Sequence, residues 1–166
     1  MGKLFAIGDI HGCLSKLQNI MDLIEIDPYN DMLVFIGDYI DRGSDSKGVI
    51  EFVLDICRRI KNVVCLMGNH EKMLINYHFE GLDEELFFMN GGHITAFSYG
   101  LVRTPKGVKM NIPEDHLEFY RSLRTLYETE KHIFVHAGLR PEVPLAKQNA
   151  HDMLWIRSEF IRSSYD

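Results

Sequence analysis

The sequence predicts an α/β fold built on a parallel sheet, and three observations support this prediction. First, short apolar runs at Leu4–Ile7, Leu33–Ile36 and Val63–Met67 are each followed by a glycine, which is typical of strands with both faces covered. Second, segments with apolar residues at helical spacing separate these runs. Third, Asp, Asn and His residues follow the runs directly. This alternation implies right-handed crossovers and a ligand site beyond the carboxyl ends of the strands.

The first two connections are predicted to be helices that return across the sheet. Asp27-Pro28 ends the first helix, because a residue before proline disfavours the helical conformation. Ser46 is the expected N-cap of the second helix. The apolar positions of the first are Leu14, Leu17, Met21 and Ile24, and those of the second are Val49, Val53, Ile56 and Ile60. Asn69-His70 is expected to open a further helix.

Residues 71–126 are predicted to form a mostly helical insertion over one side of the site. Gly91-Gly92 and Thr104–Gly107 interrupt the pattern, and the last helix is expected to include Leu117 and Leu126. The chain then returns to strand at Ile133–Val135. At this length, residues 1–166 are expected to form a single domain.

Composition and charge exclude several classes of protein. The net charge of −6 argues against a nucleic-acid-binding surface, which would be basic. The apolar runs fall short of the roughly 18 residues of a membrane span, and no signal peptide is expected before Leu4. The three cysteines are odd in number, and Cys57 and Cys65 are expected to be buried thiols. A reducing, cytoplasmic location is therefore predicted.

The residues at the strand ends are suited to metal and phosphate. Asp9 and His11 stand two positions apart, so on an extended chain both side chains point the same way and can converge on one cation. Asp38, Asp41 and Arg42 follow the second apolar run, where a pair of acids and a guanidinium are poor packing material. Each motif alone also fits a turn or a solvated ion pair.

Asn69-His70 and His136 follow the other two apolar runs. Taken singly, they fit an N-cap asparagine with a neighbouring histidine, and a structural histidine. Four strand ends that all carry such residues are hard to explain as separate turns. Oxygen and imidazole ligands without thiolate suit Mn, Fe or Zn, and a central carboxylate can bridge two metals.

The motifs GDIHG, GDYIDRG, GNHE and HAG, in this order, resemble the metallophosphoesterases of the phosphoprotein phosphatase family. The resemblance covers nearly the whole chain and is closest to the bacterial and phage-type branch, which includes phage lambda phosphatase and the symmetrical diadenosine tetraphosphate hydrolases. Further segments similar to that branch are Asn90-Gly91-Gly92, Ser98–Gly100 and Leu154–Arg157. The resemblance implies a mixed β-sandwich of two sheets flanked by helices.

The resemblance also implies a centre of two divalent metal ions. Asp9 and His11 would hold the first metal, Asp38 would bridge both, and Asn69 and His136 would bind the second. Manganese is the expected metal, with iron or zinc as alternatives. A hydroxide bridging the metals would attack phosphorus directly, without a phospho-enzyme.

The remaining roles follow from the same resemblance. His70 would protonate the leaving oxygen, and Asp41 would orient its imidazole. Arg42 would grip the phosphate, with Asn69 and Arg157 as further phosphate-binding candidates. The other histidines match no ligand position and are expected to be structural or exposed: His78, His93, His116, His132 and His151. Glu71 is expected to be a helix-start carboxylate favoured by the helix dipole rather than a ligand.

The chain departs from the family pattern at its end. The family continues with a strand and a GH-type motif whose histidine completes the second metal site, and no histidine follows His151 here. We therefore expect the C-terminal strands of the second sheet to be missing, the second metal site to be weakened, and a sheet edge to be exposed. A truncated or partial chain is the favoured explanation over a site completed by water or a degraded relative.

The expected function is metal-dependent phosphoester hydrolysis, by a serine/threonine or tyrosine protein phosphatase. One alternative is a symmetrical dinucleoside tetraphosphate hydrolase, which would need a nucleotide cleft with stacking aromatics. Tyr77, Phe79, Phe87 and Phe88 could supply these, although residues at such helical spacing are more often core. A second alternative is a non-catalytic fragment that binds metal. The expected partner is a phosphorylated protein or a small phosphoester, with no nucleic acid and no membrane; the sequence does not determine the oligomeric state.

Overall fold

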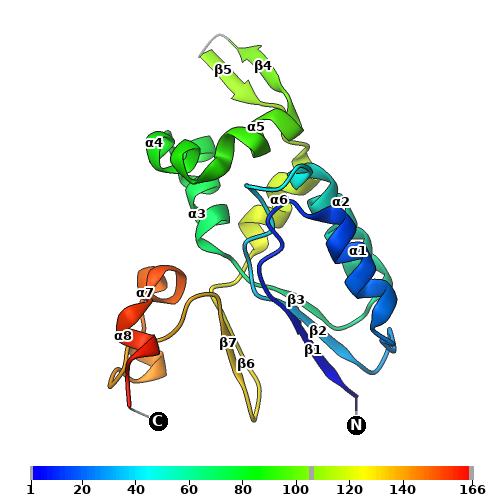
Figure 1. Cartoon of the computed structure of the whole chain (residues 1–166), viewed down its shortest axis with the longest axis vertical. Helices are drawn as coiled ribbons and strands as arrows, with labels where there is room; N and C mark the ends of the chain where they lie inside the picture. The colour runs from blue at the N-terminus through cyan, green and yellow to red at the C-terminus, as the bar shows by residue number, and fades with distance from the viewer. Residues whose placement is uncertain (1, 105–106, 165–166) are drawn as a thin grey trace.

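The computed structural model describes residues 2–104 and 107–164 of the chain. Its centre is a parallel sheet of three strands in the order β1-β2-β3, formed by β1 (Leu4–Ile7), β2 (Met32–Phe35) and β3 (Val63–Cys65) (Figure 1). The side chains of Leu33, Val34 and Phe35 in the middle strand have no exposed surface. The apolar run therefore marks a strand that is covered on both faces, and the predicted parallel α/β fold is confirmed.

Two crossover helices connect these strands, α1 (Leu14–Leu23) and α2 (Ser46–Arg59), and they lie side by side against the sheet (Figure 1). The buried face of α2 includes Val49, Val53 and Ile56, as predicted. Helix α1 ends earlier than expected, because Ile24 already has an extended backbone. The N-cap of α2 is Asp45 rather than Ser46: the Asp45 carboxylate accepts from the Gly48 amide at 2.8 Å. The Ser46 hydroxyl is thereby left for another partner.

The segment after β3 is mostly helical up to Tyr99. Asn69-His70 opens α3, as expected. The elements of this segment, in order, are α3 (Asn69–Ile75), η1 (Asn76–Glu80), α4 (Glu84–Phe87), η2 (Phe88–Gly92) and α5 (His93–Tyr99). Gly91 has a φ of +103° inside η2, so the predicted interruption is a sharp change of direction between α4 and α5.

A β-hairpin follows, which the helical prediction for residues 71–126 did not include. Strands β4 (Leu101–Thr104) and β5 (Gly107–Met110) pair antiparallel, and residues 105–106 of the predicted interruption lie outside the described residues. Helix α6 (Glu114–Ser122) then ends before Leu126, which lies in a strand and not in the expected helix. The alternation of Leu101, Val102 and Arg103 was too short to distinguish from the helical pattern around it.

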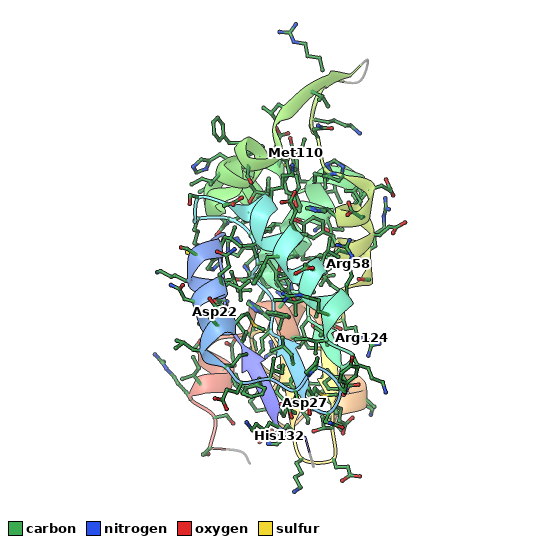
Figure 2. The ribbon with its side chains drawn as sticks, turned by 90° about the vertical axis from the view of Figure 1, so that its right-hand side faces the viewer. Asp22, Asp27, Arg58, Met110, Arg124 and His132 are labelled. Carbon is green, nitrogen blue, oxygen red and sulfur yellow. The ribbon has the colours of Figure 1, made fainter. Side chains whose placement is uncertain are left out.

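The last strands are β6 (Leu126–Glu128) and β7 (Ile133–Val135), an antiparallel pair. A parallel bridge between Leu66 and Arg124 connects this pair to the end of β3. Seen from the side, Met110 lies near one end of the molecule and His132 at the other, so the two hairpins project from opposite ends (Figure 2). Among residues 136–164, which the structure describes, there are only η3 (Leu145–Lys147), α7 (Ala150–Trp155) and α8 (Ser158–Ile161).

Two sequence expectations about burial and membranes can be compared with the fold. Cys65 is half-buried, but Cys57 is exposed on α2, so the prediction of two buried thiols is wrong for Cys57. Cys57 follows the buried Ile56 in sequence but lies on the outer face of the helix. None of the described helices has the length and apolar character needed to cross a membrane.

Candidate active site

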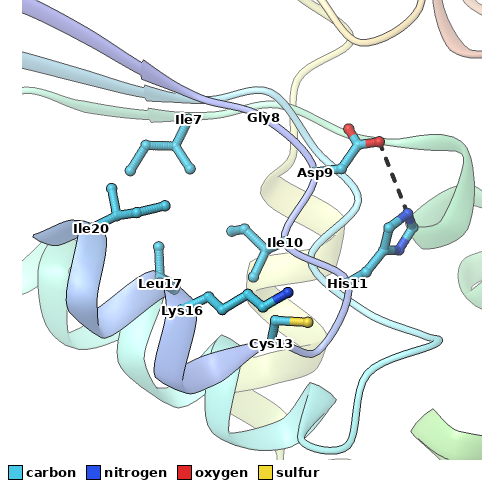
Figure 3. Close-up of a pocket in the computed structure, with 9 residues that line it drawn as sticks. All are labelled: Ile7, Gly8, Asp9, Ile10, His11, Cys13, Lys16, Leu17 and Ile20. Atoms are coloured by element: carbon cyan, nitrogen blue, oxygen red, sulfur yellow. Dashed lines mark ion pairs between the residues drawn. The ribbon is translucent and has the colours of Figure 1, made fainter.

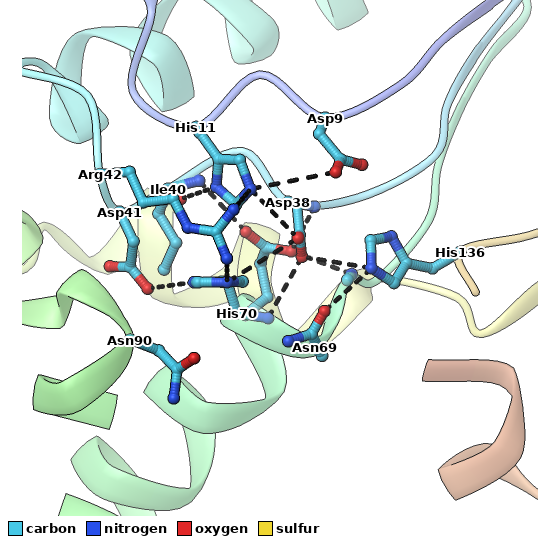
Figure 4. Close-up of polar contacts among 12 residues, drawn as sticks. Asp9, His11, Asp38, Ile40, Asp41, Arg42, Asn69, His70, Asn90 and His136 are labelled. Carbon is cyan, nitrogen blue, oxygen red and sulfur yellow. Dashed lines mark hydrogen bonds and ion pairs between the residues drawn. The ribbon is translucent and has the colours of Figure 1, made fainter. Parts of the chain in front are cut away.

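The residues after β1, β2, β3 and β7 converge around one carboxylate (Figure 4). Asp38 is 3% exposed, and its two oxygens face different imidazoles. Oδ2 lies 3.5 Å from His11 Nε2, and Oδ1 lies 3.6 Å from His136 Nε2. Parallel strands end at a common edge, which explains why the residues after β1, β2 and β3 meet here. His136 joins them from β7, which belongs to the antiparallel pair.

The loops that carry these residues are held in an uncommon backbone conformation. His11, Asp38, Asp41 and Arg42 have φ values of +45°, +52°, +71° and +66°. Non-glycine residues reach positive φ only where the surrounding structure imposes it, and such strain is concentrated at functional sites. Gly37, with a φ of +100°, is required for a second reason: a Cβ there would lie 2.4 Å from the Gly68 amide nitrogen.

Glu71 imposes this conformation on the loop after β2. Its carboxylate is fully buried and accepts from the amides of Asp38 and Gly68 at 2.9 Å, and of Tyr39 at 2.9 Å and Ile40 at 3.3 Å. Burial, together with the nearby Asp38 charge, raises the pKa of Glu71 to about 8, and the backbone donors oppose that rise. Glu71 therefore joins the loops after β2 and β3, a larger role than the helix-start carboxylate expected from sequence.

The imidazoles of His11 and His136 are oriented by backbone carbonyls. His11 Nδ1 donates to Ile40 O at 2.9 Å, and His136 Nδ1 donates to Ile36 O at 3.0 Å. A carbonyl can only accept, so each Nδ1 carries a proton, and the Nε2 atom of each ring faces Asp38. This is how metal-binding histidines are held by their outer contacts.

The donor set fits divalent metal ions. Potential ligand atoms of His11, Asp38 and His70 lie within 4.8 Å of one another, and those of Asp9, Asp38 and His136 do the same. The two groups share Asp38 and contain oxygen and imidazole nitrogen without thiolate, a set suited to Mn, Fe or Zn. Asn69 Oδ1 adjoins the second group, 3.0 Å from His136 Nε2.

His70 differs from the other two imidazoles because its Nδ1 faces a carboxylate. The distance from His70 Nδ1 to Asp41 Oδ2 is 2.6 Å, and both residues have no exposed surface. An ionised carboxylate can only accept, so His70 Nδ1 carries a proton and the ring is held in a fixed orientation. His70 Nε2 points toward the Asp38 side of the site, 3.9 Å from Oδ2.

Arg42 spans the two imidazoles of the first group. Its Nη1 lies 3.0 Å from His11 Nε2 and its Nη2 lies 3.1 Å from His70 Nε2. The guanidinium is always protonated and can only donate, so both Nε2 atoms accept. The exposed Arg42 guanidinium can therefore exchange the two imidazole acceptors for other acceptors.

Two sequence-predicted residues lie less centrally. The Asp9 side chain is 57% exposed and its Oδ2 is 3.9 Å from His11 Nε2, because the chain at His11 is left-handed rather than extended. Arg157 is exposed, and its described side-chain hydrogen bond goes to the neighbouring Ile156 carbonyl. The structure thus brings together Asp9, His11, Asp38, Asp41, Arg42, Asn69, His70 and His136. The phosphate-binding role of Arg157 stays a prediction.

Two polar residues behind the site were missed by sequence reasoning. Thr95 and Ser46 are fully buried, and both contact Asp41. Ser46 comes three residues after the GDYIDRG motif, but nothing in the local pattern around Thr95 indicates a contact with a residue 54 positions away. Among the other histidines, His116 is buried and bonds to the Tyr99 hydroxyl at 2.8 Å, as a structural histidine would.

A cavity of about 390 Å³ opens beside Asp9 and His11 (Figure 3). Lys16 and Cys13 line it from α1 together with the apolar residues Ile10, Leu17 and Ile20. The cavity lies on the β1 side of the cluster, so the exposed Asp9 carboxylate stands between the cluster and this open space.

Comparison with known proteins is consistent with this geometry. The family model described as calcineurin-like phosphoesterase matches residues 2–161. The chain belongs to the calcineurin-like phosphoesterase family. The resemblance drawn from the motifs and the metallophosphoesterase fold are both confirmed. The family implies divalent metal ions, which the donor set described above fits.

Two curated relatives and one solved structure illustrate the range of the family. The serine/threonine-protein phosphatase 1 of Salmonella typhimurium is 29% identical, with 95% of this chain and 70% of that protein covered. The symmetrical bis(5'-nucleosyl)-tetraphosphatase of Ectopseudomonas mendocina is 27% identical, with 87% and 47% covered. A protein assigned as a diadenosine tetraphosphatase has the same fold, with a TM-score of 0.63, 21% identity, and 89% of this chain and 60% of that chain covered. This chain thus spans 70% or less of each protein.

Proposed function

We propose that the chain hydrolyses phosphomonoesters with divalent metal ions, acting as a serine/threonine or tyrosine protein phosphatase. The observation that carries this proposal is the buried Asp41–His70 pair beside the shared Asp38, because it places an imidazole that a buried carboxylate orients next to the donor atoms that could hold metal ions. A metal-binding module without turnover would have no use for such an imidazole.

The metals would be held by the oxygen and imidazole donors around Asp38. In the proposed assignment these are Asp9, His11, Asp38, Asn69 and His136. When bound, two divalent ions would supply Lewis acidity toward phosphate oxygens and lower the pKa of water. Manganese is the proposed metal, with iron or zinc as alternatives, since the donors contain no thiolate.

The chain's own residues supply the proton and the phosphate clamp. His70 in its charged form would donate from Nε2 to the leaving oxygen, while Asp41 holds Nδ1. Arg42 would transfer its two donors from the histidines to phosphate oxygens, a bidentate geometry that suits a guanidinium. That transfer also frees His11 Nε2 for a ligand role and His70 Nε2 for a proton.

The aromatic side chains near the site support a phosphoprotein substrate. Phe87 is fully buried and stacks on Tyr77 with centroids 5.3 Å apart, and Phe88 contacts Tyr77 at 5.2 Å. Phe79 is covered by the Arg121 guanidinium at 4.5 Å. Because Tyr77, Phe87 and Phe88 pack on one another and Arg121 covers one face of Phe79, these rings offer little surface for stacking a base. The substrate would then be held by its phosphate and by extended contacts of a polypeptide.

A symmetrical dinucleoside tetraphosphate hydrolase remains the second candidate. It is supported by the likeness to the bis(5'-nucleosyl)-tetraphosphatase and to the protein assigned as a diadenosine tetraphosphatase. The metal and acid groups serve both reactions, so the two candidates differ in what binds beyond the phosphate. A cytoplasmic location belongs to the same proposal and is supported by three free thiols.

The test is hydrolysis of three substrates by manganese-loaded protein: p-nitrophenyl phosphate, a phosphothreonine peptide and diadenosine tetraphosphate. We expect turnover of the first two at kcat/KM well above that for the dinucleotide. A preference for the dinucleotide would establish the second candidate. Absence of turnover from folded, metal-loaded protein would leave a metal-binding fragment. His70→Asn is the control, since it removes the proposed acid and keeps the proposed ligands.

A further inference from the structure

The carboxylate of Asp41 is held from two sides. One oxygen, Oδ2, faces His70 Nδ1 at 2.6 Å. The other, Oδ1, accepts from the Thr95 hydroxyl at 2.5 Å. All three residues have no exposed surface, so no water competes for these bonds. Asp41 is therefore fixed between an imidazole and a hydroxyl.

The directions of the hydrogen bonds around Thr95 follow from counting protons. The single hydroxyl proton of Thr95 goes to Asp41 Oδ1, because an ionised carboxylate only accepts. Ser46 Oγ lies 2.8 Å from Thr95 Oγ1 and must therefore donate to it. The Asp41 amide, 3.0 Å from both hydroxyl oxygens, supplies the remaining donor. Every donor and acceptor of this buried group is satisfied in one arrangement only.

Thr95 reaches Asp41 because α5 packs over the loop after β2. The helix contacts α2, and the turn before it lies against Arg42: a Cβ on Gly91 would be 3.1 Å from the Arg42 amide nitrogen. Gly92 is covered by the Phe87 ring, whose atoms would be 2.5 Å from an added Cβ. This close packing leaves the Thr95 side chain little freedom to turn away.

We infer that Thr95 is a positioning residue for phosphoester hydrolysis: its hydroxyl holds Asp41 so that His70 presents Nε2 to the leaving oxygen. The inference rests on the proposed function and adds to it a residue outside the sequence motifs. Without the hydroxyl, Oδ1 of a buried carboxylate loses its charge-assisted donor and Asp41 turns toward other donors. The imidazole then loses its fixed orientation, and proton donation is the step that suffers.

The first test compares leaving groups in Thr95→Val, which replaces the hydroxyl by a methyl group of similar shape. p-Nitrophenolate departs without needing a proton, whereas phenolate needs one. We expect kcat for phenyl phosphate to fall about tenfold more than kcat for p-nitrophenyl phosphate, with KM little changed. Thr95→Ser, which keeps the hydroxyl, is expected to restore the wild-type ratio. Equal losses on both substrates would overturn the inference.

Two variants make the result specific. Ser98→Ala on the same helix removes a hydrogen bond from the Lys47 amide to the Ser98 hydroxyl, 2.9 Å, which joins α2 to α5 without touching Asp41. This variant is expected to keep the wild-type ratio of kcat for phenyl phosphate to kcat for p-nitrophenyl phosphate. His70→Asn sets the full effect of losing the acid. If His70→Asn lowers kcat for phenyl phosphate more than kcat for p-nitrophenyl phosphate and Thr95→Val does not, the Thr95 inference alone fails. If His70→Asn lowers kcat equally for both substrates, the proposed acid role of His70 fails together with the Thr95 inference.

A measurement that needs no activity completes the test. The downfield proton resonance of His70 Nδ1–H, assigned by its absence in His70→Asn, reports the bond to Asp41. We expect it to shift or broaden through solvent exchange in Thr95→Val and to be unchanged in Ser98→Ala. Thermal melts of the variants check that each is folded. An unchanged resonance in Thr95→Val would overturn the inference even if the wild-type protein hydrolyses neither substrate.

Discussion

Two aspartate–histidine pairs in the site are built in opposite ways. Asp9 and His11 are two residues apart in sequence, yet Asp9 Oδ2 and His11 Nε2 are 3.9 Å apart and the Asp9 side chain is 57% exposed. Asp41 and His70 are 29 residues apart, yet they form a 2.6 Å bond with no exposed surface. Closeness in sequence did not produce the tighter pair. Burial did, since exclusion of water and a low dielectric strengthen a charged hydrogen bond.

The difference matches the two tasks that a metal-dependent hydrolase has to perform. An open carboxylate such as Asp9 can be reached by a hydrated cation from solvent. A buried pair such as Asp41–His70 can hold a proton at a fixed place and shield it from water. The predictions below remove one member at a time, from the largest expected effect to the smallest.

Asp41→Asn addresses the buried pair and is expected to have the largest effect. The amide cannot stabilise a charged imidazole and can face His70 Nδ1 with a donor. We expect kcat for phenyl phosphate to fall by about 10²- to 10⁴-fold, the usual contribution of a general acid. Steady-state kinetics with saturating manganese measures this. Activity within twofold of wild type would mean that the buried pair has only a structural role.

Asp9→Asn addresses the open pair. We expect the dissociation constant for manganese to rise by at least about tenfold, because even outer contacts of metal ligands typically contribute that much. The free energy of unfolding without metal should stay within about 0.5 kcal/mol of wild type, as for exposed sites in general. Metal titration by calorimetry measures the first quantity and urea denaturation the second. An unchanged titration would remove Asp9 from the ligand set.

Glu71→Gln tests what holds the two loops together. The amide replaces one acceptor oxygen by a donor that faces backbone N–H groups, leaving buried donors without a partner. We expect the free energy of unfolding to fall by about 1–3 kcal/mol. Urea denaturation of metal-free protein measures this, with Glu51→Gln on the exposed face of α2 as the matched control. Equal stability of the two variants would mean that the loops are held by packing alone.

The smallest effect is expected from breaking the Arg140–Asp152 ion pair, and this effect on stability depends on pH. Arg140 donates from Nε and Nη2 to the two Asp152 oxygens at 2.6 Å, and this lowers the pKa of Asp152 to about 2 from an ordinary 3.8. Because the folded pKa is the lower one, the stabilisation is complete above about pH 4 and is lost as the pH falls toward 2. Acid denaturation followed by circular dichroism should show a shallower acid branch for Asp152→Asn. Superimposable acid branches would contradict the pairing.

Some features of this protein follow from the sequence alone. The apolar runs that end at Gly8, Gly37 and Gly68 predict the three parallel strands, because covered strands and amphipathic helices have distinct periods. The order of strand and helix also predicts the edge at which His11, Asp38 and His70 meet. Each of these features depends on local pattern and on the common direction of parallel strands. The family and its metal dependence follow from residues at this one edge.

Tertiary structure alone decided the contacts that hold the site. Glu71 was expected to be a helix-start carboxylate, and it does accept from the amide of Gly68 at the start of α3, but it also accepts from amides more than 30 residues away. Thr95 shows no local sign of its bond to Asp41. Likewise, Asp45 rather than Ser46 caps α2, because the Ser46 hydroxyl is held by Thr95. Arg157 donates to the neighbouring Ile156 carbonyl, a contact that the sequence pattern did not indicate. Such contacts depend on which elements pack together in space, and neither periodicity nor residue type in a short window carries that information.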